Sequence, residues 1–229
     1  MRALRGLQRL GVKAISVHTG ADADALHVSV ADESVLLGDE LSSYRDVRKV
    51  VEAALQAGAD GVHPAHATLP GLEQAVTDAG LAWLGGSLRM PVELTIGDGI
   101  VEARLGDHDV AVPAVASRAA EIVSGLDLTA AALSGAAEGT ARGGVALSVD
   151  VVADSLDPIT AWHEPSFDDV WLDAGVAVGA TPTEPLLAVL TAWGPDRDAA
   201  YALACAAWDQ LVIEGPTVPR PEALGGESA

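Results

Sequence analysis

The sequence predicts an α/β protein, with parallel strands in its first part and an α+β arrangement in the rest. Over the first third, short apolar runs alternate with amphipathic helical runs, the order expected for parallel strands joined by crossover helices. Beyond about residue 90 this order changes to a strand pair, then helices, then several strand-like runs. A hydrophobic content of 49% is enough to build a substantial core.

The elements of the first part follow from apolar spacing and from turn residues. Leu4, Leu7 and Leu10 share one side of a predicted helix. Ser42 or Ser43 is the expected N-cap of another helix. The expected strands are 12–18, 34–38, 61–63 and 81–85, and the expected helices are 2–10, 42–58 and 69–80.

The second part begins with a predicted hairpin over residues 92–105. Its turn is Gly97-Asp98-Gly99, and Asp-Gly favours a tight turn because both positions tolerate positive φ. Asp196 is the expected N-cap of the last helix. The further expected helices are 117–125, 128–139 and 196–211, and the further expected strands are 144–153, 158–163, 170–178 and 185–194.

Charge and cysteine content exclude several classes of function. The formal net charge is −20, from 13 basic and 33 acidic residues, so neither nucleic acid nor an anionic membrane surface is an expected partner. No apolar run reaches the roughly 18 residues that a membrane span needs. The single cysteine, Cys205, allows no internal disulfide, which fits a reducing compartment. We therefore expect a cytoplasmic protein.

Several stretches, in order, resemble the biotin carboxylase subunit of biotin-dependent carboxylases. Residues 10–38 ("LGVKAISVHTGADADALHVSVADESVLLG") resemble its strand, "ADRD..HV..ADE" segment and next strand. Residues 57–87 resemble its "HPGYGFLSEN" region, and 121–128 ("EIVSGLDL") its "E..TG.DL". "PITAWH" and residues 190–215 resemble its last strand and helix.

The resemblance implies a division into domains. Residues 1–87 would form a Rossmann-like N-terminal domain of the kind that precedes an ATP-grasp module. Residues 88–220 would hold a remnant ATP-grasp hairpin and a biotin carboxylase C-terminal-like domain, and 221–229 a flexible tail. The family's first strand has no counterpart here, so the other strands either close up or are covered by another chain.

The family's ATP-grasp lid and its catalytic residues also lack counterparts. Residues 87–91 span the position of the lid, and the two lysines of the chain, Lys13 and Lys49, both precede it. Glu93 matches one of the two metal-binding glutamates that the resemblance implies, whereas Leu105 stands at the other. The bicarbonate-binding segment falls near residues 112–116, which are uncharged. We therefore expect no cofactor and no metal.

A different chemistry remains open at the same face of the fold. His66, three residues after His63, lies where the strands of an open α/β sheet usually present ligands. With Glu93 and Glu164, these histidines are candidate acid/base residues. Trp171, in place of a family arginine, and Trp83 are candidate apolar binding residues.

Two functional hypotheses follow from these residues. The first is a catalytically inactive biotin-carboxylase-like protein that serves as an assembly or regulatory subunit, or binds as a homodimer. The second is a cofactor-free lyase, cyclase or isomerase that uses the emptied cleft on a small molecule. A flat apolar face would favour the first, and a defined cleft containing His66 the second.

Overall fold

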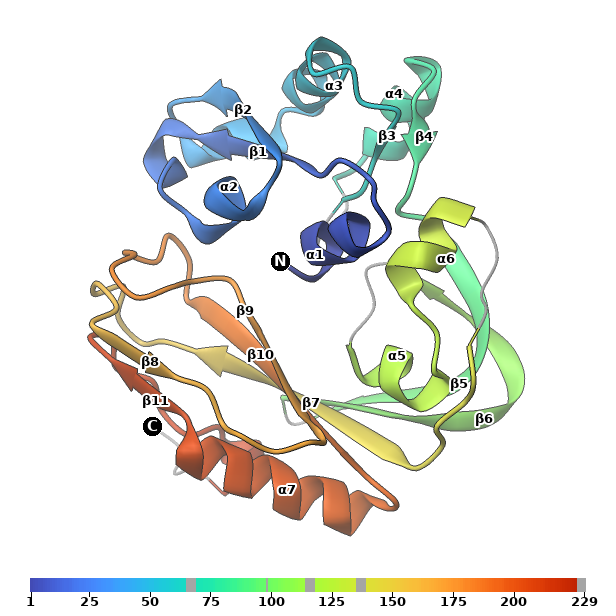
Figure 1. The fold of residues 1–229 in the computed structure, drawn as a ribbon, viewed down its shortest axis with the longest axis vertical. Helices are drawn as coiled ribbons and strands as arrows, with labels where there is room; N and C mark the ends of the chain where they lie inside the picture. The colour runs from blue at the N-terminus through green and yellow to red at the C-terminus, as the bar shows by residue number, and fades with distance from the viewer. Residues whose placement is uncertain (65–68, 98, 114–117, 135–138, 226–229) are drawn as a thin grey trace. The chain divides into compact units, whose positions relative to one another are not determined.

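The computed structural model describes residues 1–64, 69–97, 99–113, 118–134 and 139–225 (Figure 1). It divides into two compact units. Unit 1 comprises Met1–Leu88, Val112–Val115 and Leu128–Ala137, and unit 2 comprises Arg89–Ala111, Ala116–Asp127 and Glu138–Ala229. The mixed α/β class is as predicted. The expected single domain over 88–220 differs from these units, because residues 128–137 group with the N-terminal segment.

Unit 1 is built from short strands and helices, as the alternating apolar runs predict. Its strands are β1 (Ile15–Thr19), β2 (Glu33–Gly38), β3 (Gly61–Val62) and β4 (Ala82–Trp83). Its helices are α1 (Arg2–Arg9), α2 (Leu26–Val30), α3 (Val47–Gln56), α4 (Leu72–Asp78) and α6 (Leu128–Ser134), with the 3-10 turns η1 (Gly20–Asp22) and η2 (Leu41–Arg45).

The four strands of unit 1 form two separate parallel pairs. β1 pairs with β2, with Val17 opposite Val35, and β3 pairs with β4, with Val62 opposite Trp83. Parallel pairing is therefore confirmed, and in the described residues the two pairs do not join into one sheet. Of the two alternatives for the missing first strand, closing up of the remaining strands is not seen in the described residues.

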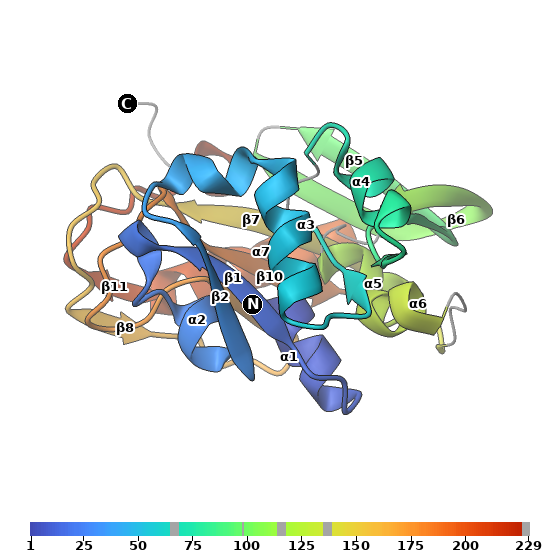
Figure 2. The ribbon, with the colours of Figure 1, turned by 90° about the horizontal axis from the view of Figure 1, so that it is seen from above.

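Helix α3 begins later than predicted. The Asp46 carboxylate accepts hydrogen bonds from the backbone N–H groups of Arg48 and Lys49, so Asp46 is the N-cap rather than Ser42 or Ser43. The two serines lie in η2, which precedes the helix. Helix α3 packs against β2 and α4 (Figure 2).

Helices α1 and α6 pack closely, which brings residues 128–134 into unit 1. A Cβ at Gly6 would lie 2.8 Å from Oγ1 of Thr129, so this approach requires a residue without a side chain. Gly6 and Leu128 are both buried at this position. The apolar periodicity of α1 predicted a helix but gave no partner for it.

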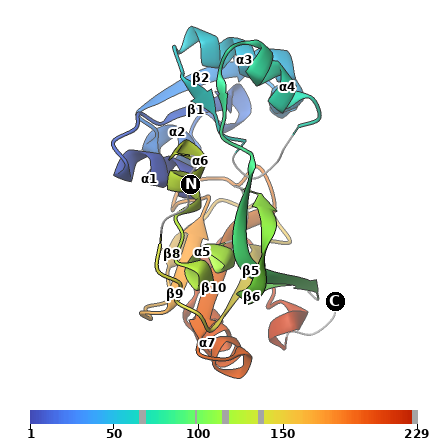
Figure 3. The same cartoon turned by 90° about the vertical axis from the view of Figure 1, so that its right-hand side faces the viewer.

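Unit 2 is organised around a five-stranded sheet with the order β5-β6-β7-β10-β9, whose strands are labelled in Figure 1. Figure 3 shows β5 and β6 side by side. Its strands are β5 (Ser87–Gly97), β6 (Ile100–Pro113), β7 (Val145–Val152), β9 (Val170–Ala174) and β10 (Leu186–Gly194). A second small sheet pairs β8 (Ala161–His163) with β11 (Val212–Glu214). The helices are α5 (Arg118–Ser124) and α7 (Arg197–Gln210), with the 3-10 turn η3 (Glu222–Leu224).

The core of unit 2 lies between the sheet and α7. The helix packs on β7 and β10, where Leu147, Leu190, Ala200 and Ala204 are all fully buried. Small alanines on the helix allow this close contact with the strands. The Asp196 side chain accepts from the backbone N–H of Ala199, which confirms the predicted N-cap.

Some segments differ from the expected elements. The short helix α2 and strand β11 were not expected from the apolar pattern. In the expected flexible tail, Leu224 is only 2% exposed and its carbonyl oxygen accepts from Nε of Arg220 at 2.7 Å. Residues 221–225 are therefore packed rather than frayed. Among the described residues, no helix has the length and apolar character to cross a membrane.

Candidate functional site

One face of the five-stranded sheet gathers polar and aromatic side chains. Residues that lie directly opposite on neighbouring strands project from the same face. The pairing therefore forms two rows across β7, β10 and β9. The first row is Ser148, Thr191 and Trp171, and the second is Asp150, Val189 and Asp173.

The first row contains a buried pair of hydroxyl groups. Oγ of Ser148 and Oγ1 of Thr191 lie 2.8 Å apart, and both residues are nearly inaccessible. In the second row, Asp150 is exposed, and partial desolvation raises the pKa of its carboxyl group above the ordinary value. The face thus combines a buried pair of hydroxyl groups with a partly desolvated carboxyl group.

Arg118, at the start of α5, binds the other carboxylate of the second row. Its Nε and Nη2 donate to Asp173 at 3.0 and 2.6 Å, and Nη1 lies 3.7 Å from Glu121. Burial opposes the charge, but the bond to Asp173 outweighs it and raises the pKa of Arg118. Sequence reasoning missed this residue. The Arg-x-x-Glu spacing at the start of a helix was the available signal.

Trp171 contacts a second arginine that the sequence analysis also missed. The guanidinium of Arg142 lies over the ring of Trp193 at 3.8 Å and near that of Trp171 at 5.7 Å. Its Nη2 also donates to the carboxylate of Asp169, and Nε1 of Trp193 donates to the Gly143 carbonyl at 2.8 Å. Trp171, predicted as an apolar binding residue, therefore lies beside an arginine in a cation–π contact.

Glu93 and Leu105 do not form a metal site. The Glu93 carboxylate accepts from Nε of Arg104 across the β5–β6 hairpin at 2.7 Å. Leu105 offers no oxygen ligand, and a hard divalent cation needs several. Within the described ranges, no three His, Cys, Asp or Glu side chains gather in a way that would hold a metal. The donor set therefore does not fit the metal ion that the family resemblance implies.

Glu164 lies just after β8, where its carboxylate accepts from Nε1 of Trp162 at 3.3 Å. The neighbouring His163 pairs with Val212 in the β8–β11 ladder and is exposed. At this strand end the Glu164 carboxylate therefore contacts the ring of Trp162, two residues earlier in the chain. No described contact joins Glu164 to Glu93, so the structure does not bring these two candidates together.

The remaining candidates belong to unit 1. His63 directly follows β3, and its pKa is lowered by burial, with Arg2 and the N-terminal amine adding to the effect. Trp83 on β4 packs with Pro64 against Gly85, where a Cβ would overlap the indole. His66 lies outside the described residues.

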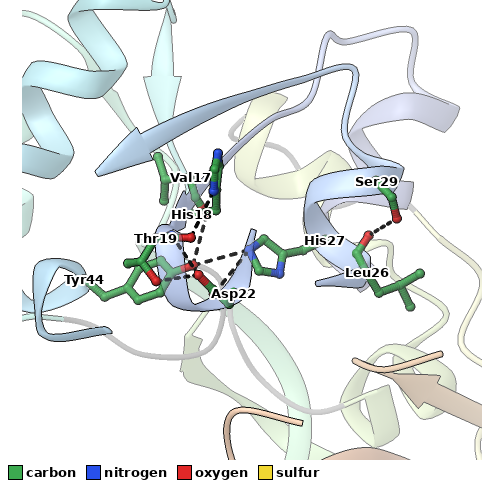
Figure 4. Close-up of polar contacts among 8 residues, drawn as sticks. All are labelled: Val17, His18, Thr19, Asp22, Leu26, His27, Ser29 and Tyr44. Atoms are coloured by element: carbon green, nitrogen blue, oxygen red, sulfur yellow. Dashed lines mark hydrogen bonds and ion pairs between the residues drawn. The ribbon is translucent and has the colours of Figure 1, made fainter. Parts of the chain in front are cut away.

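A hydrogen-bonded network links β1, η1 and η2 (Figure 4). The buried Asp22 carboxylate accepts from the Thr19 backbone N–H at 2.7 Å, from Thr19 Oγ1 at 2.6 Å and from the Tyr44 hydroxyl at 2.6 Å. Nε2 of His27 lies 3.9 Å from the same carboxylate. Thr19 and Asp22 form a capping box, so their spacing was a signal for this turn.

The environment of this network lowers the pKa of both Asp22 and His27. Burial would raise the pKa of Asp22, but the bonds from Thr19 and Tyr44 outweigh it and lower that pKa. Burial also lowers the pKa of His27, and the nearby Asp22 only partly offsets this. A charged Asp22 and a neutral His27 are therefore favoured at neutral pH, which suits a structural role.

Comparisons with known proteins agree with the sequence resemblance. Residues 1–90 match the profile of the family described as biotin carboxylase, N-terminal domain. An acyl-coenzyme A carboxylase alpha3 subunit from Mycobacterium leprae is 38% identical over 92 residues, which are 38% of this chain and 15% of that protein. A biotin carboxylase from Halalkalibacterium halodurans is 35% identical over 92 residues, 38% of this chain and 20% of that protein. The matches thus cover a small part of these relatives.

Solved structures extend the likeness to the fold of nearly the whole chain. A biotin carboxylase–β,γ-ATP complex from Campylobacter jejuni superposes with a TM-score of 0.76 at 15% identity, over 98% of this chain and 91% of that one. Pyruvate carboxylase T882A from Rhizobium etli gives a TM-score of 0.78 at 19% identity, over 95% of this chain and 35% of that one. Residues 1–90 therefore resemble a biotin carboxylase N-terminal domain, and nearly the whole chain shares the fold of these carboxylase structures.

Proposed function

We propose that this chain is a biotin carboxylase-like protein that does not carboxylate biotin with ATP and acts by associating with protein, as an assembly or regulatory subunit or as a homodimer. One observation carries the proposal. Strand β5 runs without a break from Ser87 to Gly97, through residues 87–91, where the family resemblance implies an ATP-grasp lid. A continuous strand leaves no inserted domain at this position.

The charges on the sheet face support the same conclusion. Biotin carboxylation requires cationic side chains that hold phosphate and bicarbonate. Here Arg118 is bonded to Asp173 through two nitrogens, and Arg142 is bonded to Asp169 and covered by the ring of Trp193. Both guanidinium charges are already balanced by carboxylates of the same unit.

The activity assay is direct. The purified chain is incubated with biotin, MgATP and ¹⁴C-bicarbonate, and phosphate release and labelled carboxybiotin are measured beside an active biotin carboxylase. We expect both signals to equal the buffer blank. Biotin-dependent phosphate release that co-elutes with the chain and disappears in Glu93→Gln would refute the proposal.

The names of two relatives, an alpha3 subunit and a subunit alpha of acyl-CoA carboxylases, support a carboxylase-related partner. Affinity purification of the tagged chain from its native extract, followed by mass spectrometry, tests this. We expect a carboxylase or biotin-carrier subunit in stoichiometric amount. A chain that purifies with neither another protein nor a second copy of itself would contradict a role in association.

A further inference from the structure

Strand β1 of unit 1 is paired on one side only. The backbone N–H of Glu33 donates to the Ala14 carbonyl oxygen, and this bond fixes which residues of β1 face β2. Since alternate residues of a parallel strand direct their N–H and C=O groups to opposite sides, those of Ile15 and Val17 point away from β2. Among the described residues, no strand pairs with β1 on that side.

Strand β3 has a corresponding free edge. The N–H of Leu84 donates to the Val62 carbonyl oxygen at 2.9 Å. The N–H of Ala82 donates to the Asp60 carbonyl oxygen at the same distance. Gly61, between the two acceptors, therefore directs its N–H and C=O groups away from β4. Both pairs are parallel, so each free edge accepts a further parallel strand.

Helix α1 connects the regions of these two edges. Arg2, its first residue, lies close enough to His63, directly after β3, to contribute to the lowered pKa of that histidine. From its other end, residues 10–14 lead into the start of β1. The helix thus runs from the carboxyl end of β3 to the amino end of β1, as a crossover helix does between parallel strands. A helix is about 10 Å wide and strands are about 4.8 Å apart, so one further strand fits between β1 and β3.

The side chains along these edges are less buried than those of an inner strand. Inner strands of a parallel sheet are covered on both faces. Ile15, Val17 and Val62 are only partly buried. On β7, an inner strand of unit 2, Leu147 and Val149 are at most 1% exposed. A strand between β1 and β3 would give their apolar side chains the missing neighbours.

Ser16 on β1 provides an independent observation. It is 6% exposed, and within the part of the chain that the structure describes its Oγ is the one buried side-chain N or O atom without a hydrogen-bond partner. A buried hydroxyl without a partner is destabilising and rare. On β7, the buried Ser148 hydroxyl is satisfied by Thr191 of the neighbouring strand at 2.8 Å. A hydroxyl or amide on a strand beside β1 would satisfy Ser16 in the same way.

We propose that an extended segment of a partner protein adds to unit 1 as a parallel strand between β1 and β3. Its backbone would bond to Ile15 and Val17 on one side and to Gly61 on the other, which is strand addition at two edges. Because this strand would be covered on both faces, the segment is uncharged and rich in β-branched residues, with Ser, Thr or Asn opposite Ser16. This inference rests on the proposed role in association and specifies the chemistry of the partner.

Amide hydrogen exchange of the purified chain, resolved by residue with NMR, tests whether the edge is open. The N–H groups of Ile15 and Val17 should exchange about 100-fold or more faster than those of Ser16 and His18, which face β2. Equal protection of all four would show that the edge is already paired in the isolated chain. That result would overturn the proposal.

A fused strand is the probe for the site itself. The segment Val-Thr-Val-Thr-Val-Thr-Val is joined ahead of Met1 by a flexible Gly-Ser linker, because α1 starts at the end of β3. We expect exchange at Ile15, Val17 and Gly61 to slow by about tenfold or more, and the urea midpoint to rise. The matched control has proline in place of each threonine and should change neither, since proline donates no ladder bond. A probe that behaves like its proline control would refute the site.

Competition then tests whether a partner supplies the strand. The tagged chain, the valine–threonine fusion and the proline fusion are each recovered from native extract. The first and the last should bind the same protein, and the valine–threonine fusion about tenfold less or lower, because its own strand fills the site. In the complex, Ile15 and Val17 should be protected from exchange. Circular dichroism confirms that each chain is folded.

Two outcomes of this competition would overturn the inference. Equal recovery by both fusions would place the partner elsewhere on the chain, while the proposed role in association stands. Protection of Ile15 that appears only when the chain alone is concentrated would assign the site to a second copy. The carboxylation assay is independent of both results, so a failure of the proposed loss of activity remains distinguishable.

Discussion

Removing the Tyr44 hydroxyl tests whether the Asp22 network holds unit 1 together. In Tyr44→Phe, the carboxylate loses a hydrogen bond of 2.6 Å, while its two bonds from Thr19 remain. A hydrogen bond to a charged group contributes about 1.5–3 kcal/mol, and the ring itself is retained. We therefore expect the free energy of unfolding of unit 1 to fall by about 2 kcal/mol.

Urea unfolding followed by circular dichroism measures this loss at pH 7. With a slope of about 2 kcal/mol per molar urea, the midpoint should fall by roughly 1 M. The matched control is Tyr201→Phe, at the other tyrosine of the chain, which lies half-buried in α7. Its midpoint should move by less than about 0.25 M, because exposed and half-exposed changes usually stay within 0.5 kcal/mol.

The pH dependence of the difference sharpens this test. The pKa of Asp22 in the folded chain lies below its ordinary value of 3.8, so its stabilisation is complete above that value and is lost as pH falls through the folded pKa. The gap between wild type and Tyr44→Phe should therefore narrow in strong acid. A gap that is absent at pH 7, or equal to that of Tyr201→Phe, would refute the assigned role of the network.

Three further changes follow from the described contacts. Gly215→Ala should destabilise unit 2 by more than about 3 kcal/mol in urea titration, because the φ of Gly215 is +110° and a Cβ there would overlap the Pro158 carbonyl. The control Gly179→Ala should cost only about 1–2 kcal/mol, because Gly179 has a φ of +91° but open space around it. Equal losses would contradict the steric argument. Arg118→Met should lower the free energy of unfolding by about 1–3 kcal/mol, measured by thermal unfolding. The loss should be smaller in an Asp173→Asn background, because no charged carboxylate is then left without its partner. Fully additive losses from the two substitutions would argue against the ion pair. Because the pKa of His27 is depressed by burial, stability should fall as pH drops below about 6.5, and His27→Gln should flatten that fall; an unchanged slope would count against it.

Local signals in the sequence predicted much of the fold. The Asp196 N-cap and the predicted turn at 97–99 depend on residues close together in the sequence. The structure has the capped helix α7, and β5 ends at Gly97 and β6 begins at Ile100, while Asp98 lies outside the described residues. Ser42 and Ser43 are not the caps, although they are good capping residues, because they lie within η2, and α3 starts after this turn with Asp46 as its N-cap. The sequence alone does not show this turn, so it favoured the two serines over Asp46.

The candidate site was less accessible to sequence reasoning. The stack of Arg142 on Trp193 joins residues 51 positions apart, through the pairing of strands that the sequence does not specify. Arg118 likewise finds Asp173 only because α5 packs on the five-stranded sheet. Glu93 was identified correctly as a residue of the hairpin, but its partner Arg104 was not. Long-range pairing, rather than residue type, decided each of these contacts.

The division of unit 1 into two parallel pairs also affects how it holds together. A pair of strands alone is marginal in water, because three or more strands or a covering helix are needed for independent stability. The β1–β2 pair and the β3–β4 pair share no ladder in the described residues, so α3, which contacts both β2 and α4, supplies a mechanical connection between them. Cooperative unfolding of this unit therefore depends on helix packing. A destabilising substitution in α3 would let the two strand pairs unfold separately, which a continuous sheet would prevent.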